Sequence, residues 1–188
     1  RVVIATPEPE RFTHLPGVEI DTDDTPRPFA DRLRNVLERH QPSAICYAGA
    51  GMPLMSVSQW ASLLDRITAA REPVVTTNNL YSTDVIATAE VRALAALPGD
   101  ATDNSIGLYL RDSVGMSVDT LPRSAATLLD TDTPAELQLL ALSAQARLPL
   151  GPAVRAVLEA NSDVLDLSRI STAVDALTNR ESQILVVG

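Results

Sequence analysis

The sequence predicts an α/β protein in which a sheet carries helices on both faces. Strand-like and helix-like segments alternate over most of the chain, and this alternation is typical of that architecture. The 188 residues, 45% of them hydrophobic, are enough to bury one sizeable core with a small appendage. Only 3% of the residues are aromatic, so Leu, Val, Ile and Ala have to fill that core.

Strands are expected where short runs of β-branched and apolar residues are bounded by Pro, Gly or polar loops. Residues 44–48 are the clearest buried strand, because Gly49 and Gly51 break the run directly after it. The expected strands are residues 2–5, 18–20, 44–48, 73–77, 84–87, 117–121, 126–129 and 184–187.

Helices are expected where apolar residues recur on one helical face. Ser56 and Gln59 form a capping box for one helix, and Pro149 and Gly151 stop another. The expected helices lie near residues 29–37, 56–67, 89–97, 104–114, 134–147, 153–160 and 167–177.

The pattern changes after the helix that ends near residue 147. Two helical stretches and a final strand follow, so we expect one domain at residues 1–148 and a second element at 149–188. The chain opens on Arg1 and a strand, and it closes directly after another strand. We therefore expect the sequence to be part of a longer gene product, cut at its N-terminus.

Charge and residue usage argue against several functions. The net charge of −9 argues against a general affinity for nucleic acid or anionic membranes. All 15 basic residues are Arg, which excludes Schiff-base lysines and Lys-dependent phosphate loops within this stretch. The single cysteine, Cys46, is expected to be a buried thiol without a disulfide partner. The absence of a signal peptide and of an apolar run of spanning length predicts a cytoplasmic location.

An acidic corner at residues 128–137, LLDTDTPAEL, is the most informative segment. Asp130 and Asp132 lie two apart after an expected strand, so both carboxylates should project to the same side. Thr133 and Glu136 complete a capping box for the next helix. The two carboxylates suit magnesium, which takes oxygen ligands. The alternative is a well-capped junction whose acids only favour the helix N-terminus.

Two further loops follow expected strands, where ligands bind in open α/β sheets. In the loop AGAGMPLMS, Gly49 and Gly51 allow a ligand to approach the backbone, although a tight strand-to-helix turn explains them equally well. In the loop TTNNLYSTD, polar side chains either recognise a polar ligand or form Asx turns, and they are those of Asn78, Asn79, Ser82, Thr83 and Asp84.

Arg123 is a separate candidate. It precedes the strand expected at residues 126–129, and it can pair with a ligand phosphate or with the acids of the corner.

The loop AGAGMPLMS and the later DTDTPAEL, in this order, resemble the MobA-like nucleotidyltransferases. These include the molybdenum-cofactor guanylyl- and cytidylyltransferases and 2-phospho-L-lactate guanylyltransferase, and the resemblance covers about residues 2–142. It implies a Rossmann-like, mixed, mostly parallel sheet of the nucleotide-diphospho-sugar transferase type. It also implies transfer of a nucleotidyl group from a nucleoside triphosphate to a small phosphorylated acceptor, with magnesium as cofactor.

The resemblance also implies roles for single residues. Asp130 and Asp132 would be the catalytic and metal-binding residues, and the backbone at Gly49 and Gly51 would contact the nucleotide. The acceptor contacts would come from Asn78, Asn79 and Arg123.

The sequence departs from the family at two places. The family's first strand and glycine-rich loop, with its Arg and Lys, are not in this sequence, which starts where the second strand would be. The middle loop usually reads G-D-M-P-L-L, and Gly51 stands here in place of its magnesium-binding Asp. Losing that carboxylate removes a main metal ligand, which Asp84 would replace if its loop folded over the site.

Three functions remain open. The chain is an active nucleotidyltransferase, a catalytically degenerate ligand-binding or regulatory domain of that type, or an α/β interaction domain that shares only the architecture.

Overall fold

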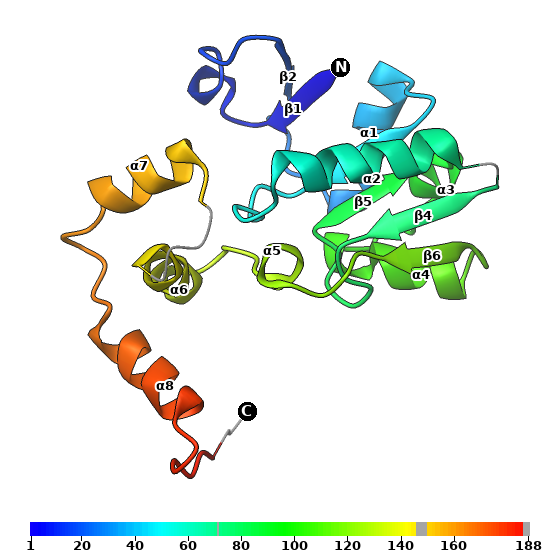
Figure 1. Ribbon diagram of the computed structural model, residues 1–188. Helices are drawn as coiled ribbons and strands as arrows, with labels where there is room; N and C mark the ends of the chain where they lie inside the picture. The colour runs from blue at the N-terminus through cyan, green and yellow to red at the C-terminus, as the bar shows by residue number, and fades with distance from the viewer. Residues whose placement is uncertain (71, 146–149, 186–188) are drawn as a thin grey trace. The chain divides into compact units, whose positions relative to one another are not determined.

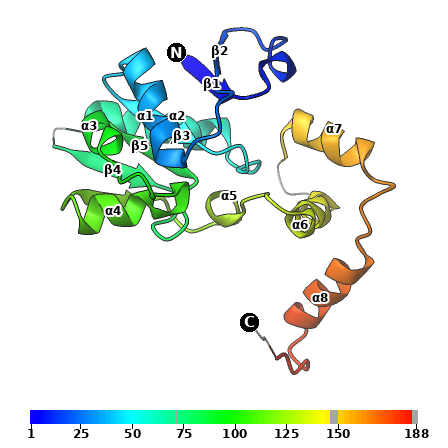
Figure 2. The same cartoon turned by 180° about the vertical axis from the view of Figure 1, so that it is seen from behind.

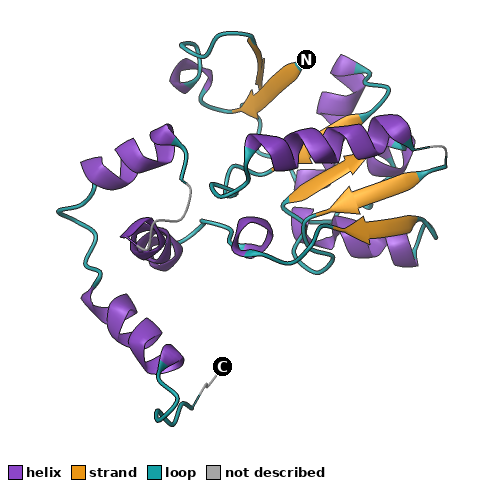
Figure 3. Cartoon of the chain, viewed as in Figure 1, coloured by secondary structure: helices purple, strands orange, loops and turns teal. Residues whose placement is uncertain are grey.

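The computed structural model describes residues 1–70, 72–145 and 150–185, and it is a mixed α/β structure (Figure 3). The chain divides into two compact units. The first comprises Arg1–Ala48 and Val57–Pro122, and the second comprises Gly49–Ser56 and Arg123–Gly188. Each unit is described by itself below.

The first unit contains two sheets. Strands β1 (Val2–Thr6) and β2 (Val18–Thr22) form a parallel two-stranded sheet, in which Val2 pairs with Val18. A four-stranded sheet has the order β3-β5-β4-β6. Its strands are β3 (Ile45–Ala48), β4 (Val74–Thr77), β5 (Val85–Thr88) and β6 (Ser117–Thr120).

A mixed sheet is confirmed, and three of the four strands of the larger sheet run in one direction. Strand β5 runs antiparallel to both β3 and β4, and only β4 and β6 pair in parallel. The short loop 78–84 joins β4 directly to β5, whereas a parallel pair needs a crossover of about a dozen residues or more. Chain connectivity therefore dictates this antiparallel hairpin.

Helices cover both faces of the four-stranded sheet, as expected. On one face lie α1 (Phe29–His40), α3 (Val91–Ala95) and α4 (Ile106–Asp112), which are seen from behind in Figure 2. On the other face α2 (Val57–Ala69) crosses in front of the strands in Figure 1 and contacts β4 and β5. Two short 3-10 helices, η1 (Pro9–Arg11) and η2 (Asp103–Ser105), complete this unit's described helical segments.

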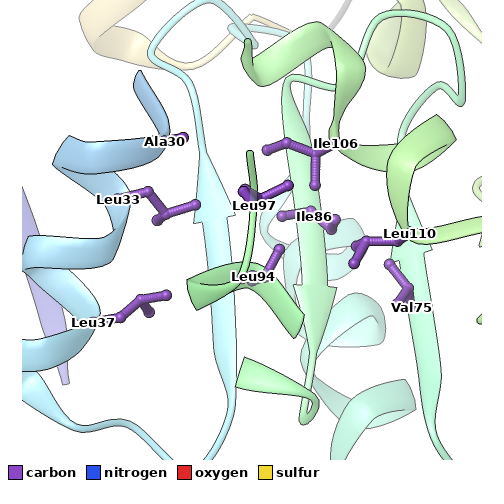
Figure 4. Packing of buried hydrophobic residues seen from close by; sticks show 9 residues of the cluster. All are labelled: Ala30, Leu33, Leu37, Val75, Ile86, Leu94, Leu97, Ile106 and Leu110. Carbon is purple, nitrogen blue, oxygen red and sulfur yellow. The ribbon is translucent and has the colours of Figure 1, made fainter. Parts of the chain in front are cut away.

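The core of the first unit lies between the sheet and its three-helix face. Val75 of β4 and Ile86 of β5 point into it from the sheet, and both are fully buried (Figure 4). The remaining buried members come from the helices and the segments that flank them, and they are almost all aliphatic, as the scarcity of aromatic residues predicts: Ala30, Leu33, Leu37, Leu94, Leu97, Ile106 and Leu110.

Ion pairs tie the two-stranded sheet to α1. The buried carboxylate of Asp21 accepts hydrogen bonds from Arg39 Nε and Nη2 at 3.0 and 2.6 Å, and its Oδ2 lies 2.7 Å from His40 Nε2. Arg32 donates to Asp23 in the same way. The acids at positions 21–23 and the basic residues at 32–40 are too far apart in the sequence for a local pattern to predict these ion pairs.

Cys46 of β3 is partly buried, in agreement with the expectation of a buried thiol. Burial raises the pKa of this thiol to about 11 and keeps it protonated at neutral pH.

The second unit is helical in its described part. Its helices are α5 (Ala125–Leu128), α6 (Pro134–Gln145), α7 (Pro152–Ala160) and α8 (Ser168–Thr178). Leu140 and Ala141 of α6 pack with Leu158 of α7, together with Leu54 and Leu150. The domain boundary expected after residue 148 stays a prediction. Helices α6 and α7, which lie on either side of it in the sequence, both contribute to this apolar cluster.

Two strands expected in this unit differ in the structure. The strand expected at residues 126–129 is wrong: this segment forms the helical turn α5. Ser124 and Thr127 cap that turn reciprocally, and the Ser124 N–H donates to Thr127 Oγ1 at 3.0 Å. Of the strand expected at 184–187, residues 184 and 185 are not in a strand, and 186 and 187 lie outside the described residues.

The helix expected at 134–147 is described as far as Gln145, and its last two residues lie outside the described part. Within the described residues, no helix combines the length and apolarity needed to cross a membrane.

Candidate functional site

The acidic corner follows a helical turn rather than a strand. Alternation along a strand therefore gives no reason for Asp130 and Asp132 to share a side. The capping box beside them is confirmed: Glu136 Oε2 accepts from the N–H groups of Asp132 and Thr133 at 2.9 and 2.7 Å, and Thr133 Oγ1 accepts from the Glu136 N–H at 3.4 Å.

The capping contacts also act on Glu136. Hydrogen bonding from the Asp132 N–H, followed by the bonds from Thr133, lowers the pKa of Glu136 below its ordinary value. Glu136 is thus ionised at neutral pH and committed to the start of α6.

Gly51 meets the acidic corner directly. The Thr131 N–H donates to the Gly51 carbonyl at 2.9 Å. A Cβ added at Gly51 would overlap the Asp130 carboxylate Oδ1 and would lie 2.9 Å from Asp130 Cγ and 3.1 Å from the Thr131 nitrogen. The two segments with the most specific resemblance to nucleotidyltransferases therefore touch one another, and Asp130 lies where a side chain at position 51 would begin.

This packing predicts that Gly51→Ala destabilises the protein. The new Cβ forces the Asp130 side chain and the neighbouring backbone to shift, and overpacking of this kind costs about 1–3 kcal/mol. Chemical denaturation measures the loss. Gly99→Ala is the matched control, because a Cβ there meets nothing within 4 Å. Equal stability of the Gly51 and Gly99 variants would contradict the close approach of Asp130.

The rest of the loop after β3 is anchored by apolar residues. Met52, Leu54 and Met55 are buried, and Leu54 packs against the cluster of α6 and α7. The described contacts thus support a tight, well-packed turn at Gly49 and Gly51. The contact of either glycine with a nucleotide stays a prediction.

The loop between β4 and β5 is held together by its own side chains. Asn78 is 2% exposed, and its Oδ1 accepts from the N–H groups of Asp84 and Val85 at 3.0 and 2.9 Å. Its Nδ2 donates to Asp84 Oδ2 at 2.9 Å. Asn79 Oδ1 accepts from the Tyr81 N–H at 3.1 Å. The bond between Asn79 and Tyr81, two residues apart, is an Asx turn, whereas the bonds of Asn78 join the two ends of the loop.

The same loop packs against the start of α4. Thr83 Oγ1, fully buried, donates to the Asn79 carbonyl at 3.0 Å and accepts from the Gly107 N–H at 3.3 Å. A Cβ at Gly107 would lie 2.9 Å from that hydroxyl oxygen. Sequence reasoning did not find the contact between Thr83 and Gly107, because it joins segments far apart in the chain.

The predicted site residues fall into two groups. Gly49, Gly51, Arg123, Asp130 and Asp132 belong to the second unit. Arg123 is exposed and lies just before α5. Asn78, Asn79 and Asp84 belong to the first unit.

The donor set of the acidic corner fits magnesium in kind. Asp130 and Asp132 offer carboxylate oxygens, and magnesium is commonly held by one or two carboxylates together with substrate phosphates and waters. In the part of the chain that the structure describes, no group of three or more His, Cys, Asp or Glu side chains gathers as a ligand set.

The comparisons with known proteins do not assign a family. No protein-family model and no curated protein matches this chain. The function is therefore inferred from the residues themselves and from the contact between Gly51 and the acidic corner.

Proposed function

We propose that the chain is a nucleotidyltransferase-like domain that transfers a nucleotidyl group from a nucleoside triphosphate to a small phosphorylated acceptor, with magnesium as cofactor. A Rossmann-like arrangement of the nucleotide-diphospho-sugar transferase type and a cytoplasmic location are parts of this proposal. The observation that carries it is the contact of Gly51 with Asp130 and Thr131, which joins the two segments of greatest resemblance.

The proposed reaction forms one bond and breaks one bond. An oxygen of the acceptor phosphate attacks the α-phosphorus of the triphosphate, and a new P–O bond forms. The bond from the α-phosphorus to the bridging oxygen breaks, and pyrophosphate leaves with its electron pair.

Residues of the second unit would have separate roles in this reaction. Asp130 and Asp132 would hold magnesium, which supplies charge neutralisation on the phosphates when bound. The backbone at Gly49 and Gly51 would contact the nucleotide, with the Asp130 carboxylate beside Gly51 in the space where a side chain would begin. Arg123, exposed before α5, supplies a bidentate cation for the acceptor phosphate.

A second function is favoured by the residue at position 51. Gly51 carries no carboxylate, and Asp130 lies against it, so the site has one acid fewer than the family pattern. In that case the domain binds the nucleotide or the acceptor without turnover and acts as a regulatory module.

Two measurements separate these functions. We expect isothermal calorimetry to detect binding of GTP, CTP or ATP in the presence of magnesium and to lose it with EDTA. We expect pyrophosphate release when a phosphorylated acceptor such as 2-phospho-L-lactate or an alkyl monophosphate is added. Binding without release favours the regulatory function, and the absence of both contradicts both functions.

A further inference from the structure

An apolar pocket of about 290 Å³ adjoins the acidic corner in the second unit. Helix α6 contributes Leu137 and Leu140, and α7 contributes Val154, Val157 and Leu158. Its volume lies at the lower end of the range of about 300–1,000 Å³ that is typical of small-molecule sites. The described lining contains no charged side chain, so the pocket suits an uncharged group of modest size.

Thr131 is the polar element of this lining. Its Oγ1 is buried and has no hydrogen-bond partner among the described residues, although most buried hydroxyls have one. Its N–H is already used by the Gly51 carbonyl, which holds this residue in place. Thr131 lies between Asp130 and Asp132 in the chain, so the pocket and the acidic corner share a wall.

The pocket is open at α7. Val157 lines it and is 53% exposed, and Ala153, also in the lining, is exposed one helical turn earlier. An apolar side chain exposed at the rim of an apolar pocket gives a ligand a route from solvent and surface to bury.

The polarity of the lining decides between ligand classes. A nucleobase or a sugar carries several donors and acceptors that each need a partner when buried. Thr131 supplies one such group, and the remaining lining is Ala, Pro, Val and Leu. An aliphatic body brings no polar atom of its own that needs a partner there.

We propose that this pocket binds the aliphatic body of the acceptor, whose phosphate would lie beside the magnesium held by Asp130 and Asp132 and within reach of Arg123. The acceptor is then an amphiphilic phosphate monoester with a short hydrocarbon chain. This inference rests on the proposed function, because it names the acceptor class of the same site. The reaction is unchanged: the ester's phosphate oxygen attacks the α-phosphorus and pyrophosphate leaves.

The test uses alkyl monophosphates of two to eight carbons with the 188-residue chain, magnesium and a nucleoside triphosphate. Burial of each added methylene raises kcat/KM for pyrophosphate release about fourfold until the pocket is full. Ala153→Trp fills the pocket and removes this chain-length dependence. Ala156→Trp, on an exposed α7 position outside the lining, is the matched control and retains it.

A second pair of variants guards against misfolding of the Trp variant. Val157→Gln places a polar group in the pocket and should flatten the chain-length dependence. Val164→Gln changes a residue that is 76% exposed and outside the lining, and it should leave that dependence intact.

The outcomes separate this inference from the proposed function. Equal kcat/KM for ethyl and hexyl phosphate, or equal behaviour of the two Trp variants, overturns the pocket assignment while turnover still supports the function. If no triphosphate is turned over, calorimetry with the same esters decides. Affinity that rises with chain length and is lost in Ala153→Trp upholds the pocket, and affinity independent of length overturns it.

Discussion

Replacing Asp130 and Asp132 together by Asn should lower magnesium-dependent pyrophosphate release about 100- to 1,000-fold. Asn keeps the size of each side chain but removes the two negative charges that would hold the cation. The capping bonds of Glu136 are to backbone N–H groups and to Thr133, and the Thr131–Gly51 bond is between backbone atoms, so the variant should fold.

The measurement is steady-state release of pyrophosphate, with magnesium binding followed by calorimetry. The double variant Asp163→Asn with Asp175→Asn is the matched control, since both acids are exposed residues of the same unit. The proposal predicts full activity for this control. Wild-type rates in the Asp130 and Asp132 variant, or an equal loss in the control, would rule out these acids as the metal ligands.

Asn78→Ala should destabilise the first unit by about 2–5 kcal/mol. The substitution removes the acceptor of the Asp84 and Val85 N–H groups and the donor to Asp84 Oδ2. Val85 is fully buried and Asn78 nearly so, and buried groups left without partners cost about 1–3 kcal/mol each.

The effect is measured by urea denaturation, and Asn79→Ala is the matched control. Asn79 is less buried, and its side-chain Oδ1 accepts from the exposed N–H of Tyr81, so its removal should cost little. A ligand-contacting Asn78 would behave differently: its Ala variant would lose ligand affinity at unchanged stability. Such a result would contradict the structural role of the Asn78 side-chain amide, which is to hold the loop together by its hydrogen bonds.

The candidate site was only partly predictable from the sequence. The capping box of Thr133 and Glu136 was predicted because its bonds join groups within one turn of chain. The prediction of a strand at 126–129 was wrong because the apolar residues there fit either a strand or a helical turn. The capping residues Ser124 and Thr127 favour the helical turn.

The polar loop 78–84 shows why residue type alone left two interpretations. Asn78 and Asp84 carry groups that bind either a ligand or the backbone, and composition does not distinguish the two. The contact with Thr83 and Gly107, which buries the loop against α4, joins segments far apart in the chain.

The sequence by itself determined the order of most helices and strands, the aliphatic nature of the core and the capping box at the start of α6. It could do so because hydrophobic periodicity and local hydrogen bonds act over a few residues. The short loop 78–84 already requires β4 and β5 to be antiparallel, but the tertiary structure alone decided that β5 also pairs with β3 and that Asp130 packs on Gly51. Both depend on which distant segments pack together, and that choice is made by the burial of whole surfaces rather than by any short pattern.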